Sequence, residues 1–472
     1  MTLHLRLLLF FCCLLSRLSS QLPFTPVDTS FSASGIVYPS ELQLQVLFQA
    51  GDTVWLNGRP AHSKGKLDFM AYLPLNGSEQ GYLWINHEST GPDPVLGDGG
   101  GASILTLAHR GRQWVQTEPP RAVDFSPVRG SWNNCLGTAT PWGTVLTSEE
   151  YEPASNAELC LGGQGLCDTS LYQGHPAYQQ YGWMVEVEVG TGRVLGKRTA
   201  MGRFSHEGAL LLADERTVYL LDDYAPGILF KFVAHRPRDL SSGRLYAYQQ
   251  QGAGGRWLPL PPDYEALAEA RRTALSLGAS FFLRLEDLVL LPDGRILLTE
   301  TGKTDVDLQA AIRMGGRPAA HLEPYQQGGR FRDLYGRILV FDTTRLHIRP
   351  YLEGGPATQG ANHLANPDNL CYDSLRHLLI IHEDINEPDN GRVPAYASGQ
   401  YYNEVYVLNL RLENPRVDDL NRLLVAPPGA ETTGSCFTPD YQHLFINLQH
   451  PDPGNPRPFW LDTTIVLSGF AH

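Results

Sequence analysis

The sequence has no excess of basic residues. Its 37 lysines and arginines are outnumbered by 50 aspartates and glutamates, which gives a net charge of −13, and no basic stripe is visible along the chain. A nucleic-acid-binding protein normally carries such a stripe, so we expect no nucleic acid as a specific partner. Hydrophobic residues make up 42% of the 472 residues and charged residues 18%, which predicts a folded chain with a substantial core.

Long hydrophobic runs are missing beyond the N-terminus. Residues 1–20 read MTLHLRLLLFFCCLLSRLSS, in which Arg6 precedes a short apolar run and small polar residues follow. This pattern is typical of a secretory signal peptide, and a retained signal anchor is the alternative. No later segment is long and apolar enough to cross a bilayer. We therefore expect residues 1–20 to be removed and the protein to be secreted, to the extracellular space or to a periplasm.

Cysteine is scarce in the remaining chain. Five cysteines follow the predicted signal peptide, and an odd number in a secreted protein leaves at least one unpaired. Cys160 and Cys167 lie in a glycine-rich stretch and could form one disulfide. Cys371 and Cys436 precede apolar residues, so we expect them in the core. Cys135 is left without a structural role.

Helical periodicity is nearly absent. Residues 262–278, PDYEALAEARRTALSLG, are the clearest helical pattern, and we interpret them as one inserted helix. Elsewhere short apolar segments alternate with turn signals, and 47 glycines and 34 prolines are scattered along the chain. This composition predicts many short strands.

A repeated hairpin pattern organises these strands. Five segments, which begin at Asn133, His206, Arg284, Asn366 and Thr433, each contain a polar residue, an apolar strand, a turn, a second apolar strand and a polar end. The polar residues are separated by 14 or 15 positions in the pairs Cys135/Glu149, Glu207/Asp222, Glu286/Glu300, Asp368/Glu383 and Cys436/His450. A weaker sixth copy ends within residues 81–89.

The spacing of these units predicts an all-β fold, a six-bladed β-propeller with a short helical insertion. The first polar residues of successive units lie 68 to 82 residues apart, which is room for a four-stranded sheet in each unit. A pair of β-sandwich domains is the alternative, but no linker is visible. We therefore expect one propeller domain over residues 21–472, with the polar ends of the hairpins meeting at the mouth of the central channel.

A metal site is the chemistry that this convergence favours. The predicted mouth would collect Cys135, Glu149, Glu150, His206, Glu207, Asp222, Asp223, Glu286, Asp287, Glu300, Asp368, His382, Glu383, Asp384 and His450. A single carboxylate at a strand end is usually solvated, but recurrence in phase is not expected of surface decoration. Carboxylates at this density repel one another, so either several of them hold protons or cations lie among them, and the second option is chemically easier. Oxygen ligands favour Ca²⁺ or Mg²⁺, and a thiolate favours a metal such as iron or zinc.

Six motifs resemble, in their order along the chain, those of the PhoX-type alkaline phosphatases. They are NNCLGTATPWGTVLTSEEY, GRFSHEGA, LDDYAPGILFKFV, RLEDLVLLPDGRILLTETG, NPDNLCYD and TGSCFTPDYQHLFINLQHP. The resemblance extends over roughly residues 81–451. It implies a secreted six-bladed propeller that hydrolyses phosphate monoesters with Ca²⁺ and Fe³⁺. In many relatives a second cysteine stands where this chain has Ser148.

The resemblance also implies roles for individual residues. Cys135 matches an iron ligand, Glu207 and Glu286 match metal-binding glutamates, and Arg284 matches an arginine that holds phosphate. Asp368, Glu300 and Glu383 fall in motifs that supply calcium ligands. We predict Arg284 and Glu286 as catalytic residues, and as metal ligands Cys135, Glu149, Glu207, Asp222, Glu286, Glu300, Asp368 and Glu383.

The predicted reaction is the release of inorganic phosphate from small phosphate esters by a metal-activated water or oxide, because cations neutralise the dianionic ester. We expect a monomer. A Ca²⁺-dependent lactonase or esterase is one alternative, although it would not need a thiolate such as Cys135. A calcium-stabilised propeller that only binds a ligand is the other, because a fold alone does not establish activity.

Overall fold

A computed structural model describes residues 22–28, 35–162, 170–171, 173–360, 362–385 and 402–470. The predicted signal peptide and the predicted Cys160–Cys167 disulfide lie outside the part of the chain whose side chains are described. In that part, no helix is long and apolar enough to cross a membrane. Most of the ordered secondary structure is β-strand, and six sheets have four or more strands.

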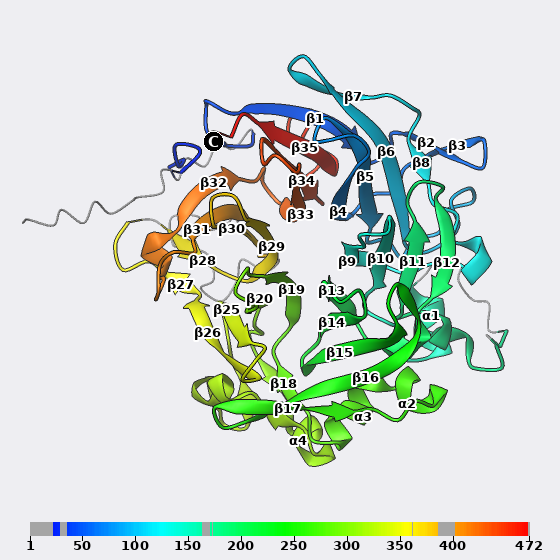
Figure 1. Ribbon diagram of the computed structural model, residues 1–472, viewed down its shortest axis with the longest axis vertical. Coiled ribbons are helices and arrows are strands. Elements are labelled where there is room, and N and C mark those ends of the chain that lie inside the picture. The colour runs from blue at the N-terminus through cyan, green and yellow to red at the C-terminus, as the bar shows by residue number, and fades with distance from the viewer. Residues whose placement is uncertain are drawn as a thin grey trace, which may run out of the picture.

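The six sheets form the blades of a propeller (Figure 1). The first blade contains β4 (Leu67–Pro74), β5 (Gln80–His87), β6 (Gly101–Arg110), β7 (Gln113–Gln116) and β8 (Arg121–Ala122), and β2 (Thr53–Leu56) and β3 (Arg59–His62) extend it. The second contains β9 (Asn134–Ala139), β10 (Thr144–Glu149), β11 (Met184–Glu188) and β12 (Arg193–Lys197). The third contains β13 (His206–Leu211), β14 (Thr217–Asp222), β15 (Gly227–Arg236), β16 (Asp239–Gln251), β17 (Gly254–Pro259) and β18 (Ser280–Phe282).

The other three blades follow the same antiparallel order. The fourth contains β19 (Leu285–Leu290), β20 (Ile296–Glu300), β25 (Arg337–Asp342) and β26 (His347–Glu353). The fifth contains β29 (Pro367–Asp373), β30 (Leu378–Glu383), β31 (Glu404–Asn409) and β32 (Asn421–Val425). The sixth contains β33 (Glu431–Phe437), β34 (His443–Gln449), β35 (Thr463–Ser468) and β1 (Gln43–Gln49). Every predicted hairpin is thus the pair of innermost strands of one blade.

The innermost strands close into a ring around the channel. Neighbouring blades contact each other through β4 and β9, β9 and β13, β13 and β19, β19 and β29, β29 and β33, and finally β33 and β4. Figure 1 shows these six strands around the centre of the molecule. The N-terminal strand β1 pairs antiparallel with β35 near the C-terminus, so the last blade is completed by the start of the chain. The predicted six-bladed fold is confirmed.

The helical insertion differs from the prediction in one respect. Residues 262–278 form two short helices, α2 (Tyr264–Ala268) and α3 (Ala270–Ser276), rather than one. The backbone of Glu269 leaves the helical region, with φ −121° and ψ 40°, and this separates them. Asp263 caps α2 by accepting a hydrogen bond from the Ala266 amide at 3.0 Å. Two further short helices, α1 (Asn156–Gly162) and α4 (Gln309–Met314), were not predicted.

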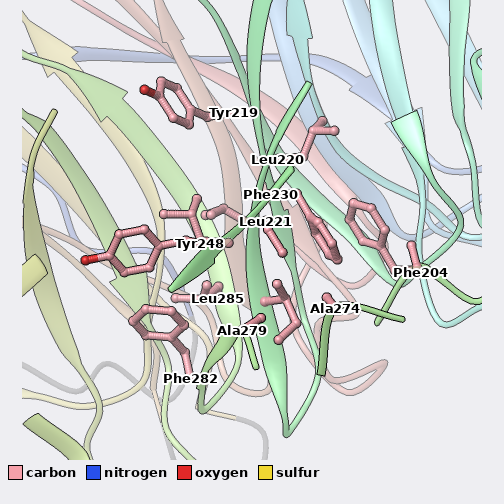
Figure 2. Packing of buried hydrophobic residues seen from close by; sticks show 14 of the residues in the cluster. Phe204, Tyr219, Leu220, Leu221, Phe230, Tyr248, Ala274, Ala279, Phe282 and Leu285 are labelled. Atoms are coloured by element: carbon pink, nitrogen blue, oxygen red, sulfur yellow. The ribbon is translucent and has the colours of Figure 1, made fainter. Parts of the chain in front are cut away.

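Hydrophobic side chains fill the space between blades and so hold the inner strands at fixed positions. Figure 2 shows part of the largest cluster, in which Phe204, Leu220, Phe230 and Leu285 pack together. Leu285 is fully buried, and it lies directly between Arg284 and Glu286 in the sequence. Burial of a side chain of this size contributes about 1.5–3 kcal/mol. This anchoring fixes the start of β19 and therefore the two polar side chains that flank Leu285.

Candidate metal centre at the channel mouth

A β-bulge near the start of each innermost strand positions the polar residues. The antiparallel register shifts at Asp68–Phe69, Cys135–Leu136, Glu207–Gly208, Glu286–Asp287 and Asp368–Asn369. A bulge adds one unpaired residue and changes the direction of a side chain. In these five blades the first bulged residue is an acid or a cysteine. Each of the five side chains lines one common cavity.

The sixth blade uses a different residue. Its bulge falls at Gly434–Ser435, and Glu431, at the start of the same strand, supplies the carboxylate instead. Gly434 has φ 32°, and a Cβ there would lie 2.5 Å from the Asp68 carbonyl oxygen of the first blade. The close approach of two inner strands therefore requires glycine at this bulge.

The cavity has a volume of about 260 Å³ and is strongly acidic. Three more carboxylates reach it from residues that follow the second strands of blades. The eight residues that we call the cavity carboxylates are Asp68, Glu88, Glu150, Glu207, Glu286, Asp368, Asp384 and Glu431. The rest of the lining consists of Lys66, Cys135, Tyr151, Arg284, Gln449 and His450.

Four overlapping groups in this cavity have the spacing of metal ligands. Within each group the potential ligand atoms lie within 4.8 Å of one another. The groups are Asp68/Glu88/Cys135, Cys135/Glu150/Glu207, Glu207/Glu286/Asp368 and Asp368/Asp384/Glu431. Consecutive groups share one residue, so they form a continuous arc of ligands across the cavity.

The electrostatics of the cavity are unfavourable without cations. Burial raises the pKa of Glu207 well above its usual range, and the nearby carboxylates of Glu150 and Glu286 raise it further. Burial and the neighbouring Glu88 raise the pKa of Asp68 to about 8. Asp68 Oδ1 and Glu207 Oε2 are buried with no hydrogen-bond partner among the described residues. Buried acceptors without a donor are costly, and a cation would satisfy them.

Cys135 lies inside this arc as a free thiol. It is buried, and its Sγ donates a hydrogen bond to Glu207 Oε1 at 3.0 Å. Burial and the carboxylates of Asp68 and Glu207 raise the pKa of the thiol well above its usual value. A metal ion would reverse this effect because thiolate binding is favoured by a nearby cation. The cavity therefore offers a mixed sulfur and oxygen donor set around Cys135 and an all-oxygen donor set among the remaining carboxylates, and both sets could hold metal ions.

Arg284 is the main cation on one side of the cavity. Its Nε donates to Asp223 Oδ1 at 2.9 Å and its Nη2 lies 2.8 Å from Glu286 Oε1. Tyr151 donates its hydroxyl hydrogen to Asp223 Oδ2 at 2.7 Å, so Asp223 orients both residues. Arg284 has φ 63° and immediately precedes β19, so it shares the cavity with Glu286 although it is not part of the strand. Asp287 instead accepts a hydrogen bond from the Leu370 amide of the next blade at 2.8 Å.

Four predicted ligands do not line the cavity. Each of them is the last residue of the second strand of a hairpin, and we call them the bracing carboxylates. They are Glu149 in β10, Asp222 in β14, Glu300 in β20 and Glu383 in β30. Each is buried and bound by groups at the edge of its own blade or in the adjoining insertion. The structure thus brings together Cys135, Glu207, Arg284, Glu286 and Asp368 of the predicted site, but not these four.

The partners of the bracing carboxylates are well defined. Lys197 Nζ lies 2.8 Å from Glu149 Oε1, and Arg271 binds both oxygens of Asp222 at 2.8 and 2.6 Å. Glu300 pairs with Arg337 and with His321 Nε2 at 2.7 Å. Glu383 accepts hydrogen bonds from two backbone amides, at 2.8 and 3.1 Å. Because these acceptors are already satisfied, their geometry favours a role in blade stability over metal binding.

Other residues of the predicted mouth also point elsewhere. His206 Nε2 lies 2.9 Å from the Gly202 carbonyl oxygen, and His382 Nε2 lies 2.8 Å from Ser435 Oγ. Ser148 is buried and donates to the Leu136 carbonyl at 2.7 Å, so it does not reach the cavity lining. The departure from the relatives' second cysteine therefore leaves the lining unchanged. Cys371 and Cys436, which were predicted in the core, are only partly buried and pack against the hydrophobic clusters.

Sequence reasoning missed Lys66, Asp68, Tyr151 and Glu431. In the first blade, Asp68 and His87 are 19 positions apart because both strands of the hairpin are longer, so the 14-to-15 spacing did not detect them. A signal was available in the order Lys66-Leu-Asp68, which repeats the arrangement of Arg284-Leu-Glu286. Glu431 was missed because the bulge of its blade is displaced along the strand.

Comparisons with known proteins agree with this geometry. The family model described as alkaline phosphatase PhoX matches residues 102–452. The structure of Pseudomonas fluorescens PhoX in complex with vanadate, a transition state analogue, is similar with a TM-score of 0.75 and 21% identity, and the match covers 96% of this chain and 100% of that one. Among curated proteins, no sequence matches significantly.

More distant structures include Pseudomonas aeruginosa periplasmic gluconolactonase, PpgL. It has a TM-score of 0.37 and 11% identity, with 86% of this chain and 87% of that chain covered. A putative 6-phosphogluconolactonase from Bacteroides uniformis has a TM-score of 0.36 and 11% identity, with 78% of this chain and 76% of that chain covered. Similarity at this level carries no argument about this chain.

Proposed function

The chain belongs to the alkaline phosphatase PhoX family, and we propose that it hydrolyses small phosphate monoesters at the acidic cavity of the propeller. The observation that carries this proposal is the joint presence of Cys135, Glu207, Arg284, Glu286 and Asp368 in that cavity. These residues come from four blades, at β9, β13, β29 and the start of β19, so their convergence depends on the packing of the blades. The activity class is that of an alkaline phosphatase-type phosphoesterase.

The proposed cofactors are Fe³⁺ and Ca²⁺. Iron would be held by Cys135 with Glu150 and Glu207, because these atoms form one ligand-spaced group that contains sulfur. Calcium would be held by the groups built from Glu207, Glu286, Asp368, Asp384 and Glu431, whose donors are all carboxylate oxygens. Bound cations would neutralise the phosphate ester and activate the attacking water. Glu286 would act in the reaction as one of these ligands.

The protein groups would bind and orient the phosphate. Arg284 is held by Asp223 and Glu286, which fixes the plane of its guanidinium beside the proposed ligands. A fixed guanidinium suits a phosphate, because two of its N–H groups match two oxygens. Asp223 would keep Arg284 from turning away from the cavity, and the Tyr151 hydroxyl would hold Asp223 in turn. Such orientation lowers the barrier because the charge of the transition state is met by a preformed donor.

We further propose that the protein is secreted and acts as a monomer. The support for secretion is the arrangement of Arg6, an apolar run and small polar residues within residues 1–20. Gel filtration and N-terminal sequencing of the exported protein would test these two points.

One experiment tests the proposed function as a whole. The purified protein is analysed for metal content, and hydrolysis of p-nitrophenyl phosphate is measured with and without added calcium. We expect bound iron and calcium and a calcium-dependent release of phosphate. Metal binding without hydrolysis of any phosphate monoester would favour the alternative of a propeller that only binds ligands. Hydrolysis of a lactone in place of a phosphate ester would favour the lactonase alternative.

A further inference from the structure

Lys66 and Arg284 occupy equivalent positions in two blades. Each immediately precedes an innermost strand, β4 for Lys66 and β19 for Arg284. Each has a left-handed backbone, with φ 52° for Lys66 and 63° for Arg284. Each lies two residues before the first residue of a bulge, Asp68 in one case and Glu286 in the other. The left-handed conformation recurs at this position in four blades, so it belongs to the turn that enters the inner strand, and this turn places the two cations equivalently.

The two cations lie on opposite sides of the cavity. Strands β4 and β19 are separated by β9 and β13 in one direction around the ring and by β33 and β29 in the other. Figure 1 shows them across the channel from each other. Both side chains line the cavity, and no other lysine or arginine is found among the described residues of its lining. The other left-handed residues at this position, Asn133 and Asn366 in the second and fifth blades, carry no charge.

The Lys66 side chain is held less tightly than that of Arg284. It is 52% exposed, and its Nζ lies 4.0 Å from Glu88 Oε1, which is beyond hydrogen-bond distance. Arg284 is 18% exposed and makes close ion pairs with two carboxylates. An exposed pair at 4.0 Å is weakly held, so the ammonium group can leave Glu88 at little cost. Its backbone is nevertheless fixed, because the Lys66 amide donates to Asp462 Oδ2.

We propose that Lys66 is a second phosphate-binding residue, which contacts non-bridging oxygens of the substrate phosphate from the side of the cavity opposite Arg284. This inference rests on the proposed phosphatase function. A phosphate monoester has three non-bridging oxygens, and one guanidinium contacts two of them at most. A flexible ammonium on a four-carbon stem suits the remaining oxygen as a point charge. Arg284 would orient the phosphate, and Lys66 would approach from the rim after the substrate has entered.

The test compares Lys66→Met, Lys66→Arg and the control Lys303→Met in the metal-loaded full chain. Lys303 is exposed and does not line the cavity. Three quantities are measured for each: kcat/KM with p-nitrophenyl phosphate, the Kd of inorganic phosphate by calorimetry, and the content of iron and calcium. We expect Lys66→Met to lose about 10- to 100-fold in kcat/KM and to raise the phosphate Kd by a similar factor. Lys66→Arg should recover most of both, and Lys303→Met should match the wild type.

The outcomes separate this inference from the proposed function. Wild-type values of kcat/KM and phosphate Kd in Lys66→Met would overturn the role of Lys66 while the phosphatase function stands. Loss of metal in Lys66→Met would also overturn it, because the residue would then support the ligands instead of the substrate. If the wild type binds phosphate but does not hydrolyse esters, a raised Kd in Lys66→Met still supports the inference. If the wild type neither binds nor hydrolyses, both proposals fail.

Discussion

Glu149 and Glu150 are neighbours in the chain, yet they have opposite environments. Glu149 ends β10 and is bound by Lys197, by Ser131 and by two backbone amides. Glu150 lies one residue later and lines the acidic cavity, where burial and the neighbouring Glu88 raise its pKa well above the usual range. The same division separates Glu383 from Asp384 in the fifth blade.

The difference shows that the bracing carboxylates and the cavity carboxylates lie at the same rim of the propeller but have different roles. We refer to them below as the two rows. The bracing carboxylates meet donors from the protein, which stabilises the ends of the blades. The cavity carboxylates have few donors and repel one another, and unpaired buried charges cost several kcal/mol each. In the proposed function, bound cations offset this cost. The comparison therefore predicts that the two rows respond in opposite ways to loss of metal and to substitution, and that Asp68 and Glu300 respond in opposite ways to pH.

Removal of metal should have the largest effect. Exhaustive chelation should abolish phosphomonoesterase activity and lower Tm, because the cavity carboxylates lose their shared cations and repel. The measurement is activity together with Tm before chelation, after it, and after iron and calcium are returned. Unchanged activity and Tm after chelation would show that the cavity carboxylates need no cations.

Cys135→Ala should remove iron and activity but leave the propeller folded. Cys135 is buried between Asp68 and Glu207 at the channel mouth and outside the hydrophobic clusters between blades, so its loss removes a ligand and little packing. Iron content, activity and the circular dichroism spectrum are compared with those of Cys436→Ala, a cysteine that packs in the core. Wild-type iron in Cys135→Ala would contradict the ligand role.

The pair Glu286→Gln and Glu300→Gln tests the two rows within one hairpin. Glu300→Gln leaves the fully buried Arg337 without one of its carboxylates, so unfolding should become easier by about 3 kcal/mol, with activity per folded molecule retained. Glu286→Gln should abolish activity without lowering Tm in chelator, because it removes a charge from the repelling group. Denaturant unfolding and activity are measured on both. The reverse pattern would show that the rows have been assigned to the wrong roles.

Arg284→Lys should have an intermediate effect on catalysis. The variant keeps the charge but loses the planar pair of donors, so we expect normal metal content and a loss of about 1–3 kcal/mol of transition-state stabilisation in kcat/KM. The guanidinium also holds Asp223 through two nitrogens, at 2.9 and 3.2 Å. A wild-type kcat/KM with intact metal would mean that Arg284 is structural.

The pH dependence of stability should have opposite signs for Asp68 of the cavity and Glu300 of the bracing carboxylates, and this is the smallest effect. In the metal-free protein, the pKa of Asp68 is raised from 3.8 to about 8, so its contribution to stability is lost as pH rises from about 4 to 8. Burial raises the pKa of Glu300, but His321 and Arg337 outweigh it and lower the pKa from 4.5 to about 2. Its contribution is therefore lost as pH falls below about 4.5.

The measurement is Tm in chelator from pH 3 to pH 8.5. Asp68→Asn should reduce the loss of stability on the alkaline side, and Glu300→Gln should reduce the loss on the acid side. Calcium should remove the alkaline loss in the wild type. Identical profiles for the wild type and Asp68→Asn would show that Asp68 does not repel its neighbours in the folded chain.

Much of the fold could be predicted because its signals are local. Alternating apolar residues, turn residues and the 14-to-15-residue spacing of polar positions identified five hairpins directly, and each is the inner pair of a blade. Arg284 and Glu286 were placed together for the same reason, since only Leu285 separates them and its side chain is buried on the other side. The helix break at Glu269 was not visible, because the alanine and leucine pattern continues through it.

The repeat in the amino-acid sequence indicated the number of blades and the direction of their polar ends, and the resemblance to the family pointed to Cys135, Glu207, Arg284, Glu286 and Asp368. Only the tertiary structure decided which of two adjacent acids enters the cavity. A bulge shifts the register of a strand by one residue, and no local pattern in these hairpins reports that shift. The partners that satisfy Glu149 and Asp222, Lys197 and Arg271, lie about 50 residues further along the chain and meet them only after the blades and the insertion have packed.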